Sequence, residues 1–270
     1  MKLAVNYSPQ AAELLRSGQI KFDLFKTPNW RSMVAEASVA APVYVHFDLK
    51  VGDGSLASVD WSEIQSFLEE TNTSFINLHV LTPPDLDTCN HTQAEAALAQ
   101  IIAEVQLVTK RFGQERVITE NIPLPEKGKD YLRPVALPAF FQRLSAETGC
   151  GMLLDLAHAA ITAQSLKTDP YTFISEFPVR RLREIHITGL GMHDGEIHDH
   201  LEMTDRDWQQ FEWALAKIRL GDWLMPNIIA FEYGGTGAPF TWRSESRVLL
   251  DQVPRLNQLI RNGNGKNTPG

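Results

Sequence analysis

The sequence predicts one (β/α)₈ barrel, in which eight parallel strands alternate with eight helices. Its 270 residues match the usual length of a single barrel of this kind. Short apolar runs rich in β-branched residues alternate with longer stretches whose apolar residues recur every three or four positions. The second period is that of a helix with one buried face. Strands that alternate with helices pair in parallel, and eight such repeats favour closure into a barrel.

The positions of the strands and of the main helices follow from this alternation. We expect strands at 2–7, 20–26, 42–48, 75–81, 117–122, 152–156, 182–188 and 227–233. We expect helices at 61–70, 92–112, 134–148, 205–218 and 244–260. Since no linker or low-complexity segment divides the chain, residues 1–260 are expected to form one domain. The last segment, 261–270, lacks apolar residues and is predicted to be disordered.

The composition is that of a globular protein, with 43% hydrophobic and 21% charged residues. The net charge of −8 argues against a broad nucleic-acid-binding surface. No apolar run approaches the roughly 20 residues of a membrane span, and the N-terminus lacks the apolar run of a signal peptide. The two cysteines, Cys89 and Cys150, indicate neither a disulfide framework nor a thiolate zinc site. These observations predict a cytoplasmic protein that does not bind a membrane.

Six successive expected strands, the third to the eighth, carry a residue type that binds metal ions. Each lies in an otherwise apolar run, where an ionised or imidazole side chain is costly unless something binds it. The carboxyl ends of barrel strands converge at one mouth, so these side chains are expected to meet there. They are His46, His79, Glu120, Asp155 with the nearby His158, His186 and Glu232.

A metal site explains this pattern better than six independent structural roles. One buried histidine is more often a hydrogen-bonded core residue than a ligand, and one buried carboxylate can simply pair with an arginine. Those explanations would have to hold at six strands in succession. Nitrogen and oxygen ligands without thiolate suit zinc, iron or manganese, and a carboxylate can bridge two ions. We therefore expect an enzyme with a site for two or three divalent ions.

Two further features bear on this site. The segment GMHDGEIHDH, expected to be a loop after the seventh strand, adds six residues of the same types. They are His193, Asp194, Glu196, His198, Asp199 and His200. Lys26 ends the expected second strand, where it could act as a base or contact an anion, although a solvated lysine at the rim explains it equally well.

The order His, His, Glu, Asp-x-x-His, His, Glu resembles the trinuclear site of the xylose-isomerase-like barrels. Within that superfamily the chain resembles the multinuclear non-heme iron oxygenase family, which modifies cysteines in ribosomally made peptides. The segments GCGMLLDLAHA, REIHITG and IIAFEYGG carry the resemblance, together with FDLFKTPNW and FINLHVL. They follow the order and spacing of the family over most of the chain.

This resemblance implies a ligand set for each ion, with iron as the metal and zinc or manganese as alternatives. The first ion would be held by His46, His79 and Glu120. The second would be held by Glu120, Asp155, His186 and Glu232. A third would take His158 with a carboxylate and a histidine from 196–200, which makes His198 and His200 the candidates. Glu120 would then bridge two ions, and it and Lys26 are the catalytic candidates.

The chain also departs from that family. An Asp-x-His is expected in the segment 196–200, but the chain offers Glu196-Ile197-His198 or His198-Asp199-His200. Lys26 stands where a carboxylate is common. The implied substrate is a cysteine-containing peptide or a small thiol, and a small partner protein could present the peptide. An endonuclease IV-like hydrolase, a sugar isomerase or epimerase, and a barrel that has lost catalysis and only binds remain alternatives.

Overall fold

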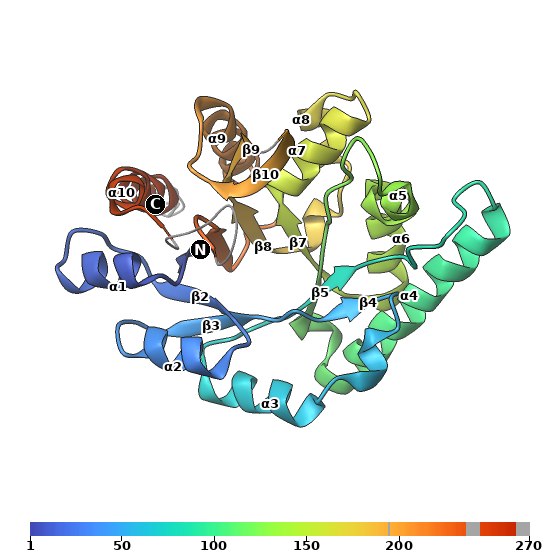
Figure 1. The fold of residues 1–270 in the computed structure, drawn as a ribbon, viewed down its shortest axis with the longest axis horizontal. Helices are drawn as coiled ribbons and strands as arrows, with labels where there is room; N and C mark the ends of the chain where they lie inside the picture. Colours follow the sequence, from blue (N-terminus) through green and yellow to red (C-terminus); the bar gives the residue numbers. More distant parts are fainter. Residues whose placement is uncertain (194, 236–243, 263–270) are drawn as a thin grey trace, which may run out of the picture. The chain divides into compact units, whose positions relative to one another are not determined.

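The computed structural model describes residues 1–193, 195–235 and 244–262. Contacts between these residues group the chain into two compact units. Unit 1 contains Met1–Val45 and the chain from Glu184 onward, and unit 2 contains His46–Arg183. Each unit has a parallel sheet with helices connecting its strands (Figure 1). Among the described residues, no helix combines the length and the apolar character that a membrane span requires.

The sheet of unit 1 has the strand order β3-β2-β1-β11-β8. Its strands are β1 (Lys2–Asn6), β2 (Leu24–Pro28), β3 (Val43–His46), β8 (Leu182–Ile187) and β11 (Ile228–Phe231). β1 pairs in parallel with both β2 and β11, and β11 pairs in parallel with β8. Side chains at the carboxyl ends of these strands therefore lie at one edge of the sheet.

Four helices of unit 1 lie among its described residues: α1 (Pro9–Arg16), α2 (Arg31–Ser38), α9 (Asp205–Arg219) and α10 (Ser246–Asn262). A capping box starts α9, because the Thr204 side chain bonds the backbone N–H of Asp207 and the Asp207 carboxylate accepts from the backbone N–H of Thr204. α10 packs on α1 and β1 and buries one apolar face that includes Val253 and Leu256.

The sheet of unit 2 has the order β7-β6-β5-β4. Its strands are β4 (Lys50–Val51), β5 (Ile76–Val80), β6 (Val117–Glu120) and β7 (Gly151–Asp155). The helices are α3 (Trp61–Glu70), α4 (His91–Phe112), α5 (Arg133–Ala136), α6 (Pro138–Thr148), α7 (Leu156–Ser165) and α8 (Pro170–Ser175). Short 3₁₀ turns occupy Ser55–Ser58, Gln114–Arg116, Asp130–Leu132 and Val179–Arg181.

All eight strands predicted from the sequence are present, and four of the five predicted helices form close to their expected bounds. The helix expected at 134–148 is instead divided into α5 and α6. Leu137, which precedes Pro138, is extended with φ −90° and ψ 140°, because a residue before proline avoids the helical region. α10 includes 261 and 262, so these two residues of the expected disordered tail are helical. The remaining eight lie outside the described residues.

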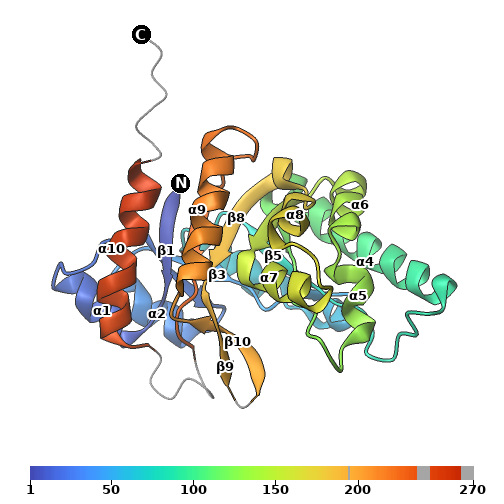
Figure 2. The same cartoon turned by 90° about the horizontal axis from the view of Figure 1, so that it is seen from above.

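The segment GMHDGEIHDH does not form the expected loop. β9 (Gly189–His193) and β10 (Glu196–Leu201) pair in antiparallel fashion as a hairpin (Figure 2). The Cβ of any other residue at Gly189 would collide with the backbone of Glu202, so glycine permits this close approach. The sequence concealed these strands because histidines and carboxylates replace the apolar and polar alternation that identifies a strand.

The two cysteines should differ in reactivity. Cys89 is exposed, whereas Cys150 is buried, and that burial raises the pKa of the Cys150 thiol. A thiol reagent such as Ellman's reagent should therefore modify one thiol per chain in the native protein, because only the accessible thiolate reacts. Both thiols should react in denaturant, and Cys89→Ser should abolish the native reaction. Rapid reaction of two thiols in the native protein would contradict the burial of Cys150.

Candidate metal centre

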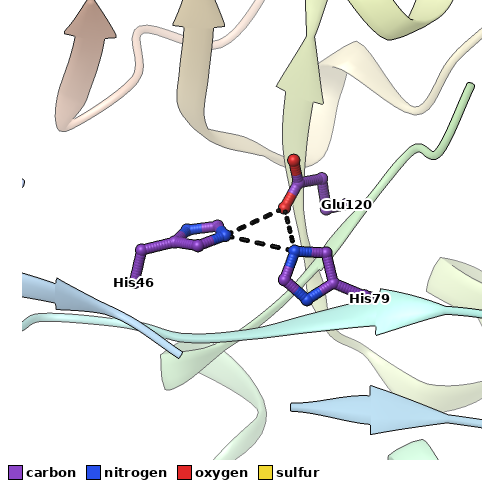
Figure 3. Close-up of side chains that lie close together, drawn as sticks. All are labelled: His46, His79 and Glu120. Carbon is purple, nitrogen blue, oxygen red and sulfur yellow. Dashed lines mark hydrogen bonds and ion pairs between the residues drawn. The ribbon is translucent and has the colours of Figure 1, made fainter. Parts of the chain in front are cut away.

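Three side chains at strand ends face one another in unit 2 (Figure 3). His46 is the last residue of β3 and Glu120 the last of β6, while His79 lies on β5 directly opposite Glu120 in the parallel register. The Nε2 atoms of His46 and His79 are 3.2 Å apart. Glu120 Oε2 lies 3.4 Å from His46 Nε2 and 3.2 Å from His79 Nε2. The three atoms therefore form a nearly equilateral triangle.

The dimensions of this triangle fit a metal ion. Ligand atoms held about 2.1 Å from one ion in tetrahedral or octahedral geometry lie about 3.0 to 3.4 Å from each other. All three observed separations, of 3.2, 3.4 and 3.2 Å, are in this range. Two imidazoles and one carboxylate thus present their ligand atoms to a common point, as the sequence predicted for the first ion.

Neighbouring groups orient both imidazoles of the triangle. His79 Nδ1 lies 3.3 Å from the Leu49 carbonyl oxygen, which can only accept, so Nδ1 carries the proton and Nε2 the lone pair. The Asn77 amide N–H donates to His46 Nε2 over 3.1 Å, which assigns a lone pair to that atom also. Asn77 is itself fixed by two hydrogen bonds with the backbone of Phe47. The contact of His79 Nδ1 with Leu49 is typical of metal-binding histidines, whereas the Asn77 amide takes up the Nε2 lone pair of His46 that an ion would need.

A second group in unit 2 contains Glu120, Asp155 and His158. His158 lies in the first turn of α7 rather than on the sixth barrel strand, which corrects the sequence-based placement. Asp155 caps that helix, because its Oδ1 accepts a hydrogen bond of 2.8 Å from the backbone N–H of His158. His158 Nδ1 donates to the Asn121 carbonyl oxygen over 2.9 Å, which leaves Nε2 as the coordinating atom.

Glu120 belongs to both groups of unit 2. Its Oε2 faces His46 and His79, while its Oε1 lies 3.8 Å from His158 Nδ1. The two oxygens of Glu120 thus face side chains of different groups, and its role as a bridge between two ions stays a prediction. The carboxylate is buried, with 3% of its side chain exposed, so its charge requires compensation from close partners.

In unit 1 the corresponding residue is Glu232, which directly follows β11. Its Oε1 forms an ion pair with Lys26 and lies 3.2 Å from His186 Nδ1. Its Oε2 lies 3.6 Å from His200 Nε2. Lys26 occupies the interior of β2 and is buried, so it is neither at the end of its strand nor a solvated lysine at the rim. The anion that it contacts is a carboxylate of the chain itself.

Sequence reasoning missed Glu184, which extends this group. His186 Nε2 lies 2.9 Å from Glu184 Oε1, and the Tyr44 hydroxyl donates to the same oxygen over 2.8 Å. Glu184 and His186 are two positions apart on β8 and so lie on one face of the strand. That spacing, in the sequence EIHI, was the signal that could have identified Glu184. Both ring nitrogens of His186 thus face carboxylates.

His200 reaches Glu232 from the hairpin. Its φ of +62° is rare for a non-glycine residue and accompanies a register shift in β10 between His198 and Leu201. Such a conformation costs of order 1 to 3 kcal/mol, so the surrounding structure must hold it. His200 Nδ1 lies 3.4 Å from the Gly234 carbonyl oxygen. His198 lies on β10 opposite Gly191 and is half-buried.

The remaining candidates of the hairpin stay predictions. Asp199 Oδ1 lies 3.9 Å from His200 Nε2. The side chains of His193, Asp194 and Glu196 lie outside what the structure describes. A third ion, and the convergence of all the strand-end residues at one mouth, likewise remain expectations from the sequence.

A cavity of about 440 Å³ lies beside the hairpin in unit 1. Leu190 and Gly191 of β9, Leu201 of β10, and Tyr233 and Gly234 after β11 contribute to its wall. Burial raises the pKa of the Tyr233 hydroxyl. Tyr233 and Gly234 follow the candidate ligand Glu232 directly in the chain.

Solved structures with the same fold establish its class. The chain resembles a xylose isomerase-like TIM barrel/4-hydroxyphenylpyruvate dioxygenase fusion protein with 17% identity and a TM-score of 0.56, over 97% of this chain and 44% of that one. It resembles 3-keto-D-glucoside 4-epimerase from E. coli with 14% identity and a TM-score of 0.52, over 96% and 99% of the two chains. The predicted fold class is confirmed: this is an α/β protein of the xylose-isomerase-like TIM-barrel class.

The sequence comparisons identify the family. Residues 28–224 match the model of the family described as RiPP precursor modification enzyme MbnB/TglH/ChrH, and the chain belongs to this family of enzymes. A UPF0276 protein of Caulobacter vibrioides is 33% identical over 39% of this chain and 36% of its own length. A UPF0276 protein of Rhizorhabdus wittichii is 23% identical over 66% of each chain. The chain thus spans less than two thirds of each of these two relatives. The resemblance drawn from the strand-end motifs is confirmed.

Asn121 should be essential for the stability of the second group of unit 2. Its side chain donates to the Asp155 carbonyl oxygen over 2.9 Å and accepts from the Asp155 backbone N–H over 2.8 Å. Asn121→Ala would leave both buried groups without these partners, and we expect it to lower the free energy of unfolding by about 1 to 3 kcal/mol. Urea denaturation measures this change. The exposed Asn227→Ala provides the control, and equal stability of the two variants would contradict the assigned role.

Proposed function

We propose that this protein is an iron-dependent oxidoreductase that modifies a cysteine-containing peptide or a small thiol. The triangle formed by His46, His79 and Glu120 is the observation that carries the proposal. Two histidines and one carboxylate around one point, with further coordination positions left to substrate and oxygen, are typical of non-heme iron oxygenases. Family membership supports the same chemistry, because the family is described by its action on peptide precursors.

When bound, the metal would supply redox chemistry and a position for the substrate sulfur. The side chains of this chain have the task of holding it and keeping it oriented. The Leu49 carbonyl accepts from Nδ1 of His79 and so leaves its Nε2 lone pair for the metal, and His46 Nε2 would exchange its hydrogen bond from Asn77 for the metal. Two or three ions are proposed in total, with Glu120 as the bridge and Asp155 and His158 as further ligands. A small partner protein that presents the peptide is part of this proposal.

A peptide substrate is compatible with the surroundings of the candidate ligands. The cavity beside β9 and β10 combines apolar walls from Leu190 and Leu201 with the hydroxyl of Tyr233. A pocket of several hundred cubic ångströms suits one or two peptide residues better than a whole folded domain. We propose that this cavity of unit 1 binds an apolar side chain of a peptide.

Metal analysis followed by a substrate assay tests the proposed function. The protein is purified anaerobically, its metals are measured, and it is incubated with a cysteine-containing precursor peptide with and without dioxygen. We expect iron, and an oxygen-dependent mass change that is absent when every cysteine of the peptide is replaced by serine. Zinc with cleavage of abasic DNA would support an endonuclease IV-like hydrolase instead. Manganese with epimerisation of a ketose would support a sugar epimerase, and either result would overturn the proposal.

Glu120 should be the most sensitive metal ligand. Glu120→Gln retains the shape of the side chain but removes the negative charge shared by the two ligand groups of unit 2, whereas His46 belongs to only one of the groups within that unit. Plasma mass spectrometry should therefore find a larger loss of metal per chain in Glu120→Gln than in His46→Gln. Circular dichroism checks that both variants are folded. A Glu120→Gln variant with the metal content of the unaltered protein would show that Glu120 is not a bridging ligand.

A further inference from the structure

Lys26 is a buried cation on the central part of a sheet. It lies in the interior of β2, and 8% of its side chain is exposed, compared with 4% for its partner Glu232. A buried ammonium group is costly unless an opposite charge accompanies it. Lys26 and Glu232 satisfy this condition for each other through a direct ion pair.

The register of three strands explains how these two residues meet. Lys26 on β2 stands opposite Asn6 on β1, and Val5 on β1 stands opposite Phe231, the residue before Glu232. Lys26, Asn6 and Glu232 therefore occupy one row across the sheet, and the two outer residues are separated by two strand spacings, about 9.6 Å. The long lysine and glutamate side chains can span this distance together.

The ammonium group pairs with the carboxylate oxygen that an ion held by Glu232 and His186 would need. Glu232 Oε1 is the oxygen that meets Lys26 and that also lies 3.2 Å from His186 Nδ1. A divalent ion held by His186 Nδ1 and Glu232 would sit beside this oxygen, next to the positive charge of Lys26. Like charges in a buried environment repel strongly, because little water is present to screen them. The ammonium and a second cation therefore exclude each other.

The other ring nitrogen of His186, Nε2, also contacts a carboxylate. Its Nε2 lies 2.9 Å from Glu184 Oε1, and the Tyr44 hydroxyl donates to that oxygen over 2.8 Å. Glu184 thus has two close partners, and Glu232 has the ammonium of Lys26. The four buried side chains of Lys26, Glu232, His186 and Glu184 form a chain of contacts, in which the ammonium group of Lys26 offsets the charge of one of the two carboxylates.

We propose that Lys26 is a built-in cation that replaces a metal ion at Glu232 and His186. Metal binding is then confined to the ligand groups of unit 2, and the protein holds fewer ions than the resemblance based on strand-end motifs implies. Lys26 acts as a positioning residue, because it fixes Glu232 rather than exchanging a proton with substrate. This inference rests on the proposed function as a metal enzyme.

Metal stoichiometry tests the inference without relying on activity. The unaltered protein and Lys26→Met are loaded with ferrous iron under anaerobic conditions, desalted and analysed. Methionine removes the charge but keeps most of the length of the side chain. We expect Lys26→Met to bind one more ion per chain than the unaltered protein, and the double variant Lys26→Met/Glu232→Gln to lose that gain. Lys21→Met, which alters an exposed lysine in the same part of the chain, should leave the stoichiometry unchanged.

The reciprocal experiment uses His186. His186→Gln should leave the metal content of the otherwise unaltered protein unchanged, whereas His79→Ala should lower it. Loss of an ion in His186→Gln, or no gain in folded Lys26→Met, would overturn the role of Lys26 while leaving the proposed function intact. If Lys26→Met does not fold, the metal stoichiometries of Lys26→Gln and His186→Gln provide the same test: a gain of one ion is expected in the first and no change in the second. Absence of metal from the unaltered protein, with no effect of His79→Ala, would instead refute the proposed function.

Discussion

The parallel pairing of β5 with β6 is the constraint on which the candidate metal centre depends, because it sets His79 directly beside Glu120. Glu120 is buried, and a buried carboxylate persists only where donors or cations compensate its charge. His46, His79 and His158 approach this carboxylate from three different elements. Asparagine side chains on β5 and immediately after β6 then fix the local backbone. The packing around the carboxyl ends of these strands is therefore organised by the charge of one residue.

Unit 1 has a comparable buried carboxylate, that of Glu232, but its charged partner is of a different kind. Glu120 faces imidazole groups, which can act as neutral metal ligands, whereas Glu232 faces the side chain of Lys26 in addition to His186 and His200. Imidazole nitrogen can exchange a proton for a metal ion at little cost near neutral pH. A lysine ammonium group that is paired with a carboxylate does not readily exchange a proton for a metal ion. Two similar buried glutamates can therefore differ in whether a metal ion is needed beside them.

The sequence was sufficient for the strands, because apolar β-branched runs mark buried parallel strands independently of their neighbours. It also indicated the ionisable residues within such runs, of which His46, His79 and Glu120 lie together in unit 2. It failed at the hairpin, where His198 and His200 break the apolar alternation, and at His158, which Asp155 places on a helix by capping it. It did not reveal Asn77, Asn121 or Glu184 as partners of the histidines. Their roles depend on contacts between segments up to about 140 residues apart in the chain.

The role of Lys26 could not be predicted from the sequence either. From the sequence alone, a lysine near a strand end has the same pattern whether its ammonium is solvated, catalytic or paired. The register that places Lys26, Asn6 and Glu232 in one row removes this ambiguity, because it determines which charge the ammonium meets. A shorter carboxylate at position 26 would instead add a second negative charge near Glu232, which favours a divalent cation. Under the role proposed for Lys26, the residue on the second strand controls the number of metal ions, although a complete strand separates it from the carboxylate with which it pairs.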